Sequence, residues 1–325
     1  MKRLRVRIFR IVSIVLFLGT SLIFTTNHAI SGEEVESQKA VLVTGASSGL
    51  GLEITKVLAA KGYYVYAGAR KKKDLAFLDK MENVSSIRLD VTKQGEIDAA
   101  VKKIKKAGRG LYGLVNNAGV AIVAPLIEVE EADLEFLFNV NVYGPYRVTK
   151  AFAPLIIESK GRITTISSIS GILSGSLLGP YSMSKHAIEA YGDSLAKEMS
   201  RFEVQVSLVE PGNYNSKIGR SMAKRIRKNK QTFDKSLYKN EIQRMVSMFD
   251  NDNIGKHPKE VADAVFHFMN SDKPKTRYMV VPNERLARIT VAKAMKEMLQ
   301  LNHEQPYSYS KEELIKMMEK LLGEM

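Results

Sequence analysis

The 325-residue chain is predicted to fold as an α/β protein: a doubly wound parallel sheet of about seven strands with helices on both faces. Two observations indicate this fold class. From residue 39 onwards, short apolar runs of strand length alternate with helix-length amphipathic segments, and such alternation favours parallel strands joined by right-handed crossovers. Glycines cluster where the first strand leads into the first helix, as expected at a ligand-binding turn of such a sheet.

The expected strands are AVLVTG from Ala40, YYVYAG from Tyr63, SIRLDV from Ser86, LYGLVNNAG from Leu111, RITTISS from Arg162, VQVSLVEPG from Val204 and RYMVVP from Arg277. Between the first two lies GLEITKVLAAKG, whose apolar residues recur at helical steps and whose Gly62 is a typical helix stop. No repeat or linker follows residue 40, so one domain is expected over residues 39–285.

Two later segments differ from this alternation. Residues 213–258 are polar and basic, and we interpret them as a lid, because loops beyond the carboxyl ends of the strands build ligand sites in such sheets. Residues 286–325 are expected to form a helical extension. Within it, SKEEL from Ser310 is typical of a capped helix start.

Residues 1–32 have a separate composition. Five basic residues occur in the first ten, and the run Ile11–Thr26 is apolar and uncharged. This pattern predicts an N-terminal apolar helix that acts as a single-pass signal anchor. A signal peptide cleaved after AIS is the alternative, and the protein would then be secreted or released into a periplasm or lumen. The basic flank favours a cytosolic N-terminus. A single-pass anchor would then place the following domain on the far side of the membrane, in a periplasm or lumen. That position conflicts with the usual cytosolic supply of nicotinamide cofactors.

Composition excludes several kinds of function. The chain has no cysteine, and its five histidines lack ligand spacing, so disulfides, thiolate catalysis and a metal site are not expected. The formal net charge is +14, with clusters at Lys102–Lys106 and Arg220–Lys230. We interpret the first cluster as a solvated helix face; attraction to anionic lipid is the alternative for the second. No aromatic stacking platform accompanies the charge, so nucleic-acid binding is not expected.

The stretch VTGASSGLG joins the first strand to the first helix. Its glycines Gly45, Gly49 and Gly51 permit a tight turn and a close approach of backbone to a phosphate, and the helix N-terminus offers free N–H groups. Glycines at such a turn can also be only structural. Taken by itself, this motif leaves nucleotide binding undecided.

A tyrosine and a lysine four residues apart occur three times, as Tyr146 with Lys150, Tyr181 with Lys185, and Tyr307 with Lys311. Only Tyr181 follows a strand that ends in serine, thirteen residues after Ser168. We therefore predict that the Tyr181 pair carries the chemistry and that the other two are ordinary surface residues.

Taken together, TGASSGLG, NNAG, the serines 167–168 and YSMSK stand in the order and spacing typical of the short-chain dehydrogenase/reductase family, which the chain resembles over about residues 39–285. GLVNNAG, VEPGNY and PKTRYMV resemble the branch that contains retinol, 17β-hydroxysteroid and hydroxybutyrate dehydrogenases. The resemblance implies a Rossmann-type sheet and NAD(P)-dependent oxidoreduction.

The resemblance also implies roles for individual residues. The catalytic tetrad falls on Asn141, Ser168, Tyr181 and Lys185. The implied cofactor-binding residues include Tyr181 and Lys185 together with Gly45, Ser47, Ser48, Gly49, Leu50, Gly51, Arg70, Asp90, Asn117, Ala118, Gly119, Pro211 and Gly212. In the loop after Gly212 the family usually has a threonine, whereas this chain has Ser216 and Lys217.

The chemistry of the tetrad is physically coherent. Residues four apart lie on one side of a helix, so the Lys185 ammonium is expected beside the Tyr181 phenol, where it would lower the tyrosine pKa. Tyr181 would then exchange a proton with the substrate oxygen near neutral pH, and Ser168 would hydrogen-bond the same oxygen. Asn141 is expected to hold a water connected to Lys185.

Cofactor choice depends on the end of the second strand. Ala69 stands where an NAD enzyme usually has an acidic residue, and Arg70 can accommodate a 2′-phosphate, so NADP(H) is favoured and NAD(H) is the alternative. Arg70 and the adjoining lysines can also be solvated residues.

The expected substrate is a small lipophilic alcohol, ketone or aldehyde of steroid-, retinoid- or hydroxyacyl-like character. Ile172, Leu173, Leu177 and Leu178 precede Tyr181 and suggest an apolar pocket, although core packing explains them equally well. The competing hypothesis is a non-catalytic nucleotide-binding regulatory protein at a membrane. The family resemblance is compatible with a homo-oligomer.

Overall fold

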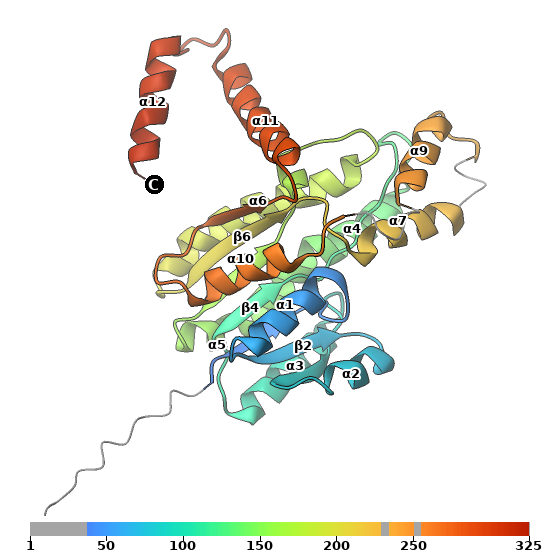
Figure 1. Cartoon of the computed structure of the whole chain (residues 1–325), viewed down its shortest axis with the longest axis vertical. Helices are drawn as coiled ribbons and strands as arrows, with labels where there is room; N and C mark the ends of the chain where they lie inside the picture. Colours follow the sequence, from blue (N-terminus) through green and yellow to red (C-terminus); the bar gives the residue numbers. More distant parts are fainter. Residues whose placement is uncertain (1–37, 229–233, 250–254, 325) are drawn as a thin grey trace, which may run out of the picture. The chain divides into compact units, whose positions relative to one another are not determined.

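A computed structural model of the protein describes residues 38–228, 234–249 and 255–324 (Figure 1). Residues 1–32, for which an apolar helix is predicted, lie outside the described residues, so the anchor stays a prediction. Across the ranges given above, no helix combines the length and apolar character needed to cross a bilayer.

The centre of the fold is one parallel sheet of seven strands, in the order β3-β2-β1-β4-β5-β6-β7. The strands are β1 Ala40–Val43, β2 Tyr64–Ala69, β3 Val84–Arg88, β4 Gly113–Asn116, β5 Arg162–Ile166, β6 Gln205–Pro211 and β7 Arg277–Val280. The winding reverses between β1 and β4, which creates the crevice where such sheets bind ligands. The predicted Rossmann-type fold is confirmed.

The third strand lies earlier in the chain than its sequence predicts, at Val84–Arg88 instead of from Ser86 onwards. A local turn explains where it ends. One carboxylate oxygen of Asp90 accepts hydrogen bonds from the backbone N–H of Thr92 (3.0 Å) and from its hydroxyl (2.8 Å). These hydrogen bonds from the Asp90 side chain form a turn, and the turn ends the strand pairing before Val91.

The helices are α1 Gly49–Ala60, α2 Lys72–Leu78, α3 Gln94–Ala107, α4 Glu131–Asn141, α5 Tyr143–Glu158, α6 Gly179–Ser200, α7 Lys217–Lys228, α9 Lys239–Phe249, α10 Lys259–Asn270, α11 Glu284–Asn302 and α12 Lys311–Gly323. A short 3₁₀ helix, η1, spans Ile169–Gly171. The segment interpreted as a lid therefore contains α7 and α9, and the C-terminal extension contains most of α11 and all of α12.

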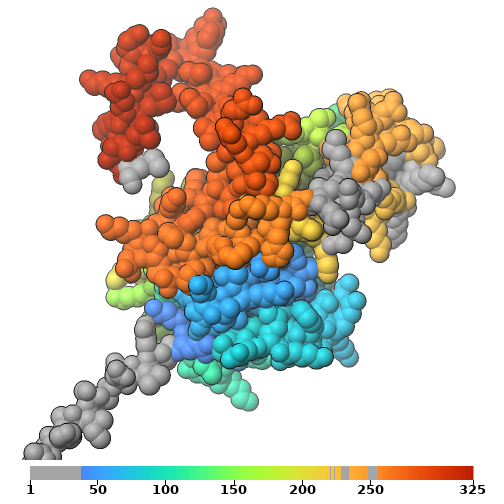
Figure 2. All heavy atoms as spheres, in the orientation of Figure 1, coloured from blue at the N-terminus to red at the C-terminus, as the bar shows by residue number. Residues whose placement is uncertain are grey.

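Helices cover both faces of the sheet, and the period-two alternation of the strands supplies both cores. In β1, Val41 and Val43 pack with α1 and α10, whereas Leu42 faces the opposite core with α3 and α5. Figure 2 shows α10 lying along α1 on the first of these faces. Buried apolar side chains on both faces explain why the strands are continuous hydrophobic runs.

Two predicted helix ends are confirmed. Gly62 follows α1 with φ of 90°, a conformation that glycine adopts without a Cβ clash. At the start of α12, the Ser310 hydroxyl accepts from the Glu313 N–H (3.2 Å) and the Glu313 carboxylate accepts from the Ser310 N–H (2.8 Å). This capping box places Tyr307 before a helix instead of inside an active-site helix.

Candidate active site

The side chains predicted to act in catalysis gather at the carboxyl ends of the central strands. Ser168 follows β5, Asn141 is the last residue of α4, and α6 carries both Tyr181 and Lys185. Hydrogen bonds and close packing connect these elements to the loop after β4 and to the end of β6. The structure thus brings together all four residues of the predicted tetrad.

Lys185 is buried beneath Tyr181 on the same side of α6. Its ammonium lies 5.6 Å from the centre of the Tyr181 ring and donates to the carbonyl of Ile166 at 2.9 Å. Only 6% of the lysine surface is exposed. A hydrogen bond to the last residue of β5 therefore fixes the position of this cation.

Ser168 is held at the entrance to η1. Its hydroxyl accepts from the Ser170 N–H at 3.1 Å and lies 3.4 Å from the Pro211 carbonyl, to which it donates. It also reaches the Tyr181 phenol closely enough to affect its proton affinity. The two groups expected to hydrogen-bond one substrate oxygen are therefore neighbours.

Asn141 is buried, and its amide is fully engaged. Its Oδ1 accepts from the Val120 N–H (2.9 Å), and its Nδ2 donates to the Val120 carbonyl (2.9 Å) and to the Ser184 hydroxyl (3.0 Å). Ser184 in turn donates to the Tyr181 carbonyl at 2.7 Å. Sequence reasoning missed Ser184, which precedes Lys185 and connects Asn141 to α6; its place in YSMSK was the available signal.

The expected direction of the tyrosine pKa shift is wrong for the protein alone. Burial raises the pKa of Tyr181 to about 12, and the hydrogen bond with Ser168 opposes this only in part. Burial also lowers the pKa of Lys185 to about 8, while the charge of Glu189 acts in the other direction. The charge of Lys185 does not reverse this upward shift, because the ammonium is directed at the Ile166 carbonyl and desolvation dominates at the phenol.

The other two tyrosine–lysine pairs lack such surroundings. Lys150 donates to the exposed Tyr146 hydroxyl at 3.4 Å on the surface of α5. Tyr307 is 83% exposed and precedes α12. Lys150 and Lys311 are both exposed, so neither tyrosine has the buried lysine found beside Tyr181.

The glycine-rich turn after β1 is packed tightly enough to exclude side chains. A Cβ on Gly51 would lie 2.3 Å from Asn117 Nδ2, and one on Gly45 would lie 2.9 Å from the Ala118 Cα. Ser48 is the N-cap residue of α1, yet its side chain makes no capping hydrogen bond. Backbone N–H groups at this helix start are therefore available to an anion, which fits a nucleotide pyrophosphate.

Thr44 ties this turn to the end of β4. Its hydroxyl accepts from the backbone N–H groups of Asn117 (2.9 Å) and Ala118 (3.0 Å). The Asn117 amide donates back to the Thr44 carbonyl at 2.8 Å. Sequence reasoning did not single out Thr44, although a polar residue at the end of a buried strand was a usable signal.

The remaining predicted cofactor residues lie around the same crevice. Ser47, Ser48, Gly49 and Leu50 are half-buried at the start of α1. A Cβ on Gly119 would lie 3.5 Å from Asn141 Oδ1, so this glycine adjoins the tetrad. Across the crevice, Ser216 approaches Gly49, where a Cβ would lie 3.4 Å from the serine Cβ.

Arg70 and Asp90 meet at the ends of β2 and β3. An Arg70 guanidinium nitrogen lies 3.6 Å from a carboxylate oxygen of Asp90, and the arginine side chain is 61% exposed. Although burial favours the neutral acid, hydrogen bonds from Thr92 and the charge of Arg70 hold the pKa of Asp90 below its usual range. Arg70, predicted to accommodate a 2′-phosphate, and Asp90, predicted to bind the cofactor, are therefore neighbours.

The segment interpreted as a lid presents apolar side chains to the site. Met222 and Ile226 of α7 and Ile242 of α9 are buried in a cluster that includes the partly buried ring of Tyr181 and also Leu177. Leu178 is packed against the same cluster, so two of the four apolar residues predicted beside the tyrosine lie there.

An ion pair between Arg225 and Asp133 joins α7 to α4, and the guanidinium lies 5.2 Å from the centre of the Phe136 ring. At least this one cation of the basic cluster around α7 is therefore engaged within the protein.

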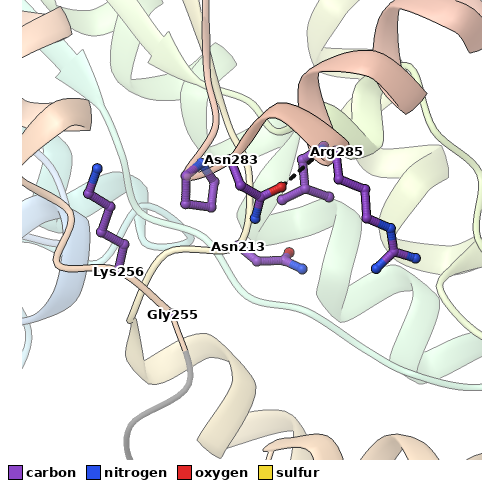
Figure 3. Close-up of a pocket in the computed structure, with 7 residues that line it drawn as sticks. Asn213, Gly255, Lys256, Asn283 and Arg285 are labelled. Carbon is purple, nitrogen blue, oxygen red and sulfur yellow. Dashed lines mark hydrogen bonds between the residues drawn. The ribbon is translucent and has the colours of Figure 1, made fainter.

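A cavity of about 300 Å³ opens beside the loop that leaves β6 (Figure 3). Its lining comes from three segments: Asn213, the pair Gly255–Lys256, and the start of α11 with its N-cap Asn283. Asn283 Oδ1 accepts from the Leu286 N–H at 3.0 Å. No member of the predicted tetrad lines this cavity, so we do not assign the substrate to it.

Comparisons with known proteins show similarity to one family. The family profile described as short chain dehydrogenase matches residues 39–227. The mitochondrial D-beta-hydroxybutyrate dehydrogenase of Bos taurus is 34% identical over 278 residues, covering 77% of this chain and 79% of that protein. Retinol dehydrogenase 7 of Mus musculus is 32% identical over 254 residues, covering 74% and 79%.

Among solved structures, a short-chain dehydrogenase from Streptomyces avermitilis is similar with a TM-score of 0.67. It shares 27% sequence identity, and the match covers 82% of this chain and 95% of that one.

Proposed function

The chain belongs to the short-chain dehydrogenase/reductase family, and we propose that it interconverts a lipophilic alcohol and its ketone or aldehyde, with NADP(H) as the favoured cofactor. The observation that carries this proposal is the convergence of Ser168, Tyr181 and Lys185 beneath an apolar lid. Asn141 completes the group through Ser184.

In this proposal Tyr181 is the proton-transfer residue. Because burial raises its pKa to about 12, the phenol is protonated at neutral pH and can donate to a carbonyl oxygen during reduction. The Ser168 hydroxyl hydrogen-bonds the same oxygen as negative charge develops on it. Lys185 places a cation beside the ring and so favours the phenolate when the proton leaves.

The cofactor is proposed to lie across the crevice from Arg70 to the tetrad. The uncapped start of α1, with Gly45, Gly49 and Gly51, would hold the pyrophosphate. Asp90 would contact the adenine, and Arg70 would pair with a 2′-phosphate. Asn117, Ala118 and Gly119, with Pro211 and Gly212, would line the remainder. The bound nicotinamide supplies or accepts the hydride.

Apolar side chains around Tyr181 favour a lipophilic substrate. Met222, Ile226 and Ile242 are buried on the lid side of the ring, and Ile122, Ala124 and Leu137 form a second buried cluster against the same tyrosine. Ile122, Ala124, Met222 and Ile226 also line a pocket, and an apolar substrate body in it would cover the small surface that these side chains leave accessible, which stabilises binding roughly in proportion to the area covered.

Residues 1–32 are proposed to attach the protein to a membrane, because basic residues precede an apolar run there.

Purified protein tests the proposal directly. We expect the absorbance of reduced nicotinamide to change when NADP⁺ is supplied with retinoids or hydroxysteroids, and to change less with short hydroxy acids. The competing hypothesis, a non-catalytic nucleotide-binding regulator, predicts cofactor binding by fluorescence without turnover of any member of the panel.

A further inference from the structure

A cluster of charged residues that the proposed chemistry does not use lies behind the tetrad. Glu189 stands one helical turn beyond Lys185 on the same side of α6, and Glu210 is the residue before Pro211 in β6. Both carboxyl groups belong to buried residues, with 9% and 2% of the surface exposed. Two acidic side chains in such a place require compensation for their charge.

Arg277 of β7 supplies part of that compensation. One guanidinium nitrogen contacts Glu189 and lies 3.1 Å from Glu210, while the other donates to both carboxylate oxygens of Asp193 at 2.6 Å. A single cation cannot neutralise three carboxylates. Burial, followed by the charge of Glu189, raises the pKa of Glu210 to about 7, so Glu210 is partly protonated near neutral pH.

The same cluster contacts η1 and the end of β6, the two segments next to Ser168, and lies on α6, which carries Tyr181 and Lys185. A Cβ on Gly171 would lie 2.7 Å from Glu189 Cγ, so this side chain packs against η1, directly after Ser168. Glu210 leads into Pro211, whose carbonyl faces the Ser168 hydroxyl. Oε1 of Glu189 is buried and, among the described residues, has no hydrogen-bond partner.

We propose that Glu189 is a positioning residue for the tetrad. Held by its contact with Arg277, it places a negative charge one helical turn from Lys185, and this charge favours the ammonium form of the lysine and keeps it directed at the Ile166 carbonyl. This inference rests on the proposed function for its meaning in catalysis. Among the described residues, the charged groups facing Glu189 are Lys185 and Asp193 of α6, Glu210 of β6 and Arg277 of β7, and η1 contributes none.

The direct test is the titration of Lys185 by ¹⁵N NMR in the full chain without cofactor or substrate, with K185R identifying its resonance. We expect the E189Q midpoint to lie about one pH unit or more below that of the wild type, which is the effect of removing a nearby opposite charge. Glu210 can ionise more readily once Glu189 is gone, so E189Q/E210Q removes that compensation. D193N is the matched control, because Asp193 is exposed and contacts only the outer nitrogen of Arg277.

Unchanged Lys185 midpoints in both E189Q and the double variant would overturn the proposal, and so would an equal shift in D193N. Because this titration needs no turnover, a failure of the proposed function leaves it intact. Where turnover is measured, E189Q is expected to lower kcat more than it changes KM. In the pH–rate profile, the limb that reflects the titration of Lys185 is expected to move to lower pH. A change in KM alone contradicts a role in positioning the tetrad.

E210Q supplies an independent stability measurement. Because the folded-state pKa of Glu210 is raised to about 7 from an ordinary value of 4.5, the folded state binds more protons in that window. Wild-type stability should therefore fall as pH rises from about 5 to about 7, and this fall should be smaller in E210Q. Identical pH dependences of Tm would contradict a proton held by Glu210 in the folded state.

Discussion

Replacing Arg70 with alanine tests how the protein selects its cofactor. A charge-assisted hydrogen bond to a phosphate contributes about 1.5–3 kcal/mol. Arg70 already lies 3.6 Å from Asp90. That exposed pair, worth about 0–1 kcal/mol, must be loosened or shared when a phosphate binds. The difference spans about 0.5–3 kcal/mol, and the middle of that range, about 1–2 kcal/mol, corresponds to a loss of about 5- to 30-fold in NADPH affinity for Arg70→Ala.

The assay is the dissociation constant of NADPH and of NADH, each measured by fluorescence for the wild type, Arg70→Ala and the control Lys72→Ala. Lys72 is exposed at the start of α2 and carries the same charge close by. We expect Arg70→Ala to weaken NADPH alone and Lys72→Ala to change little. Equal losses for the two cofactors would refute a role for Arg70 in recognising the 2′-phosphate.

Three further changes test separate parts of the structure. Gly51→Ala should destabilise the protein by about 1–3 kcal/mol in thermal unfolding, because its Cβ would lie 2.3 Å from Asn117 Nδ2. The control Gly95→Ala should not destabilise it, because in the described part of the chain no atom lies within 4 Å of the added Cβ. Equal effects of the two substitutions would contradict this packing. Ile226→Ala should raise KM about tenfold for a lipophilic alcohol, which corresponds to about 1.4 kcal/mol of lost apolar contact. The KM for short hydroxy acids should change little. Equal KM changes for both substrate classes would show that the lid does not bind the substrate. Deleting residues 1–32 should release the protein from membranes that retain the full chain after a carbonate wash, and release of the full chain would contradict an integral anchor.

The architecture was predictable because its signals are local. The central strands β1, β2, β4 and β5 are short apolar runs buried on both faces of the sheet, so composition alone marks them, whereas the edge strand β7 is exposed at Arg277 and Met279. The tetrad was predictable for a related reason. Tyr181 and Lys185 lie on one helix, and a serine at a strand end, Ser168, precedes them at a set distance, so the pattern distinguishes them from Tyr146.

Features that depend on distant contacts were not predictable. Arg277 meets Glu189 and Glu210 across 88 and 67 residues of sequence, and no local pattern relates them. The direction of the Tyr181 pKa shift was also missed, because spacing places a lysine nearby without revealing how strongly the phenol is desolvated. The end of β3 was likewise missed, because it depends on the turn that the Asp90 side chain forms with Thr92.

The central claim is that Tyr181, and no other tyrosine at the same spacing from a lysine, transfers the proton. The most direct measurement compares kcat of Tyr181→Phe and Tyr146→Phe on the best alcohol of the panel, with cofactor affinity measured alongside. The account predicts that Tyr181→Phe loses about 10²- to 10⁴-fold in kcat with cofactor binding nearly intact, and that Tyr146→Phe, altered on the exposed face of α5, retains wild-type turnover. Near-wild-type turnover by Tyr181→Phe would contradict the account.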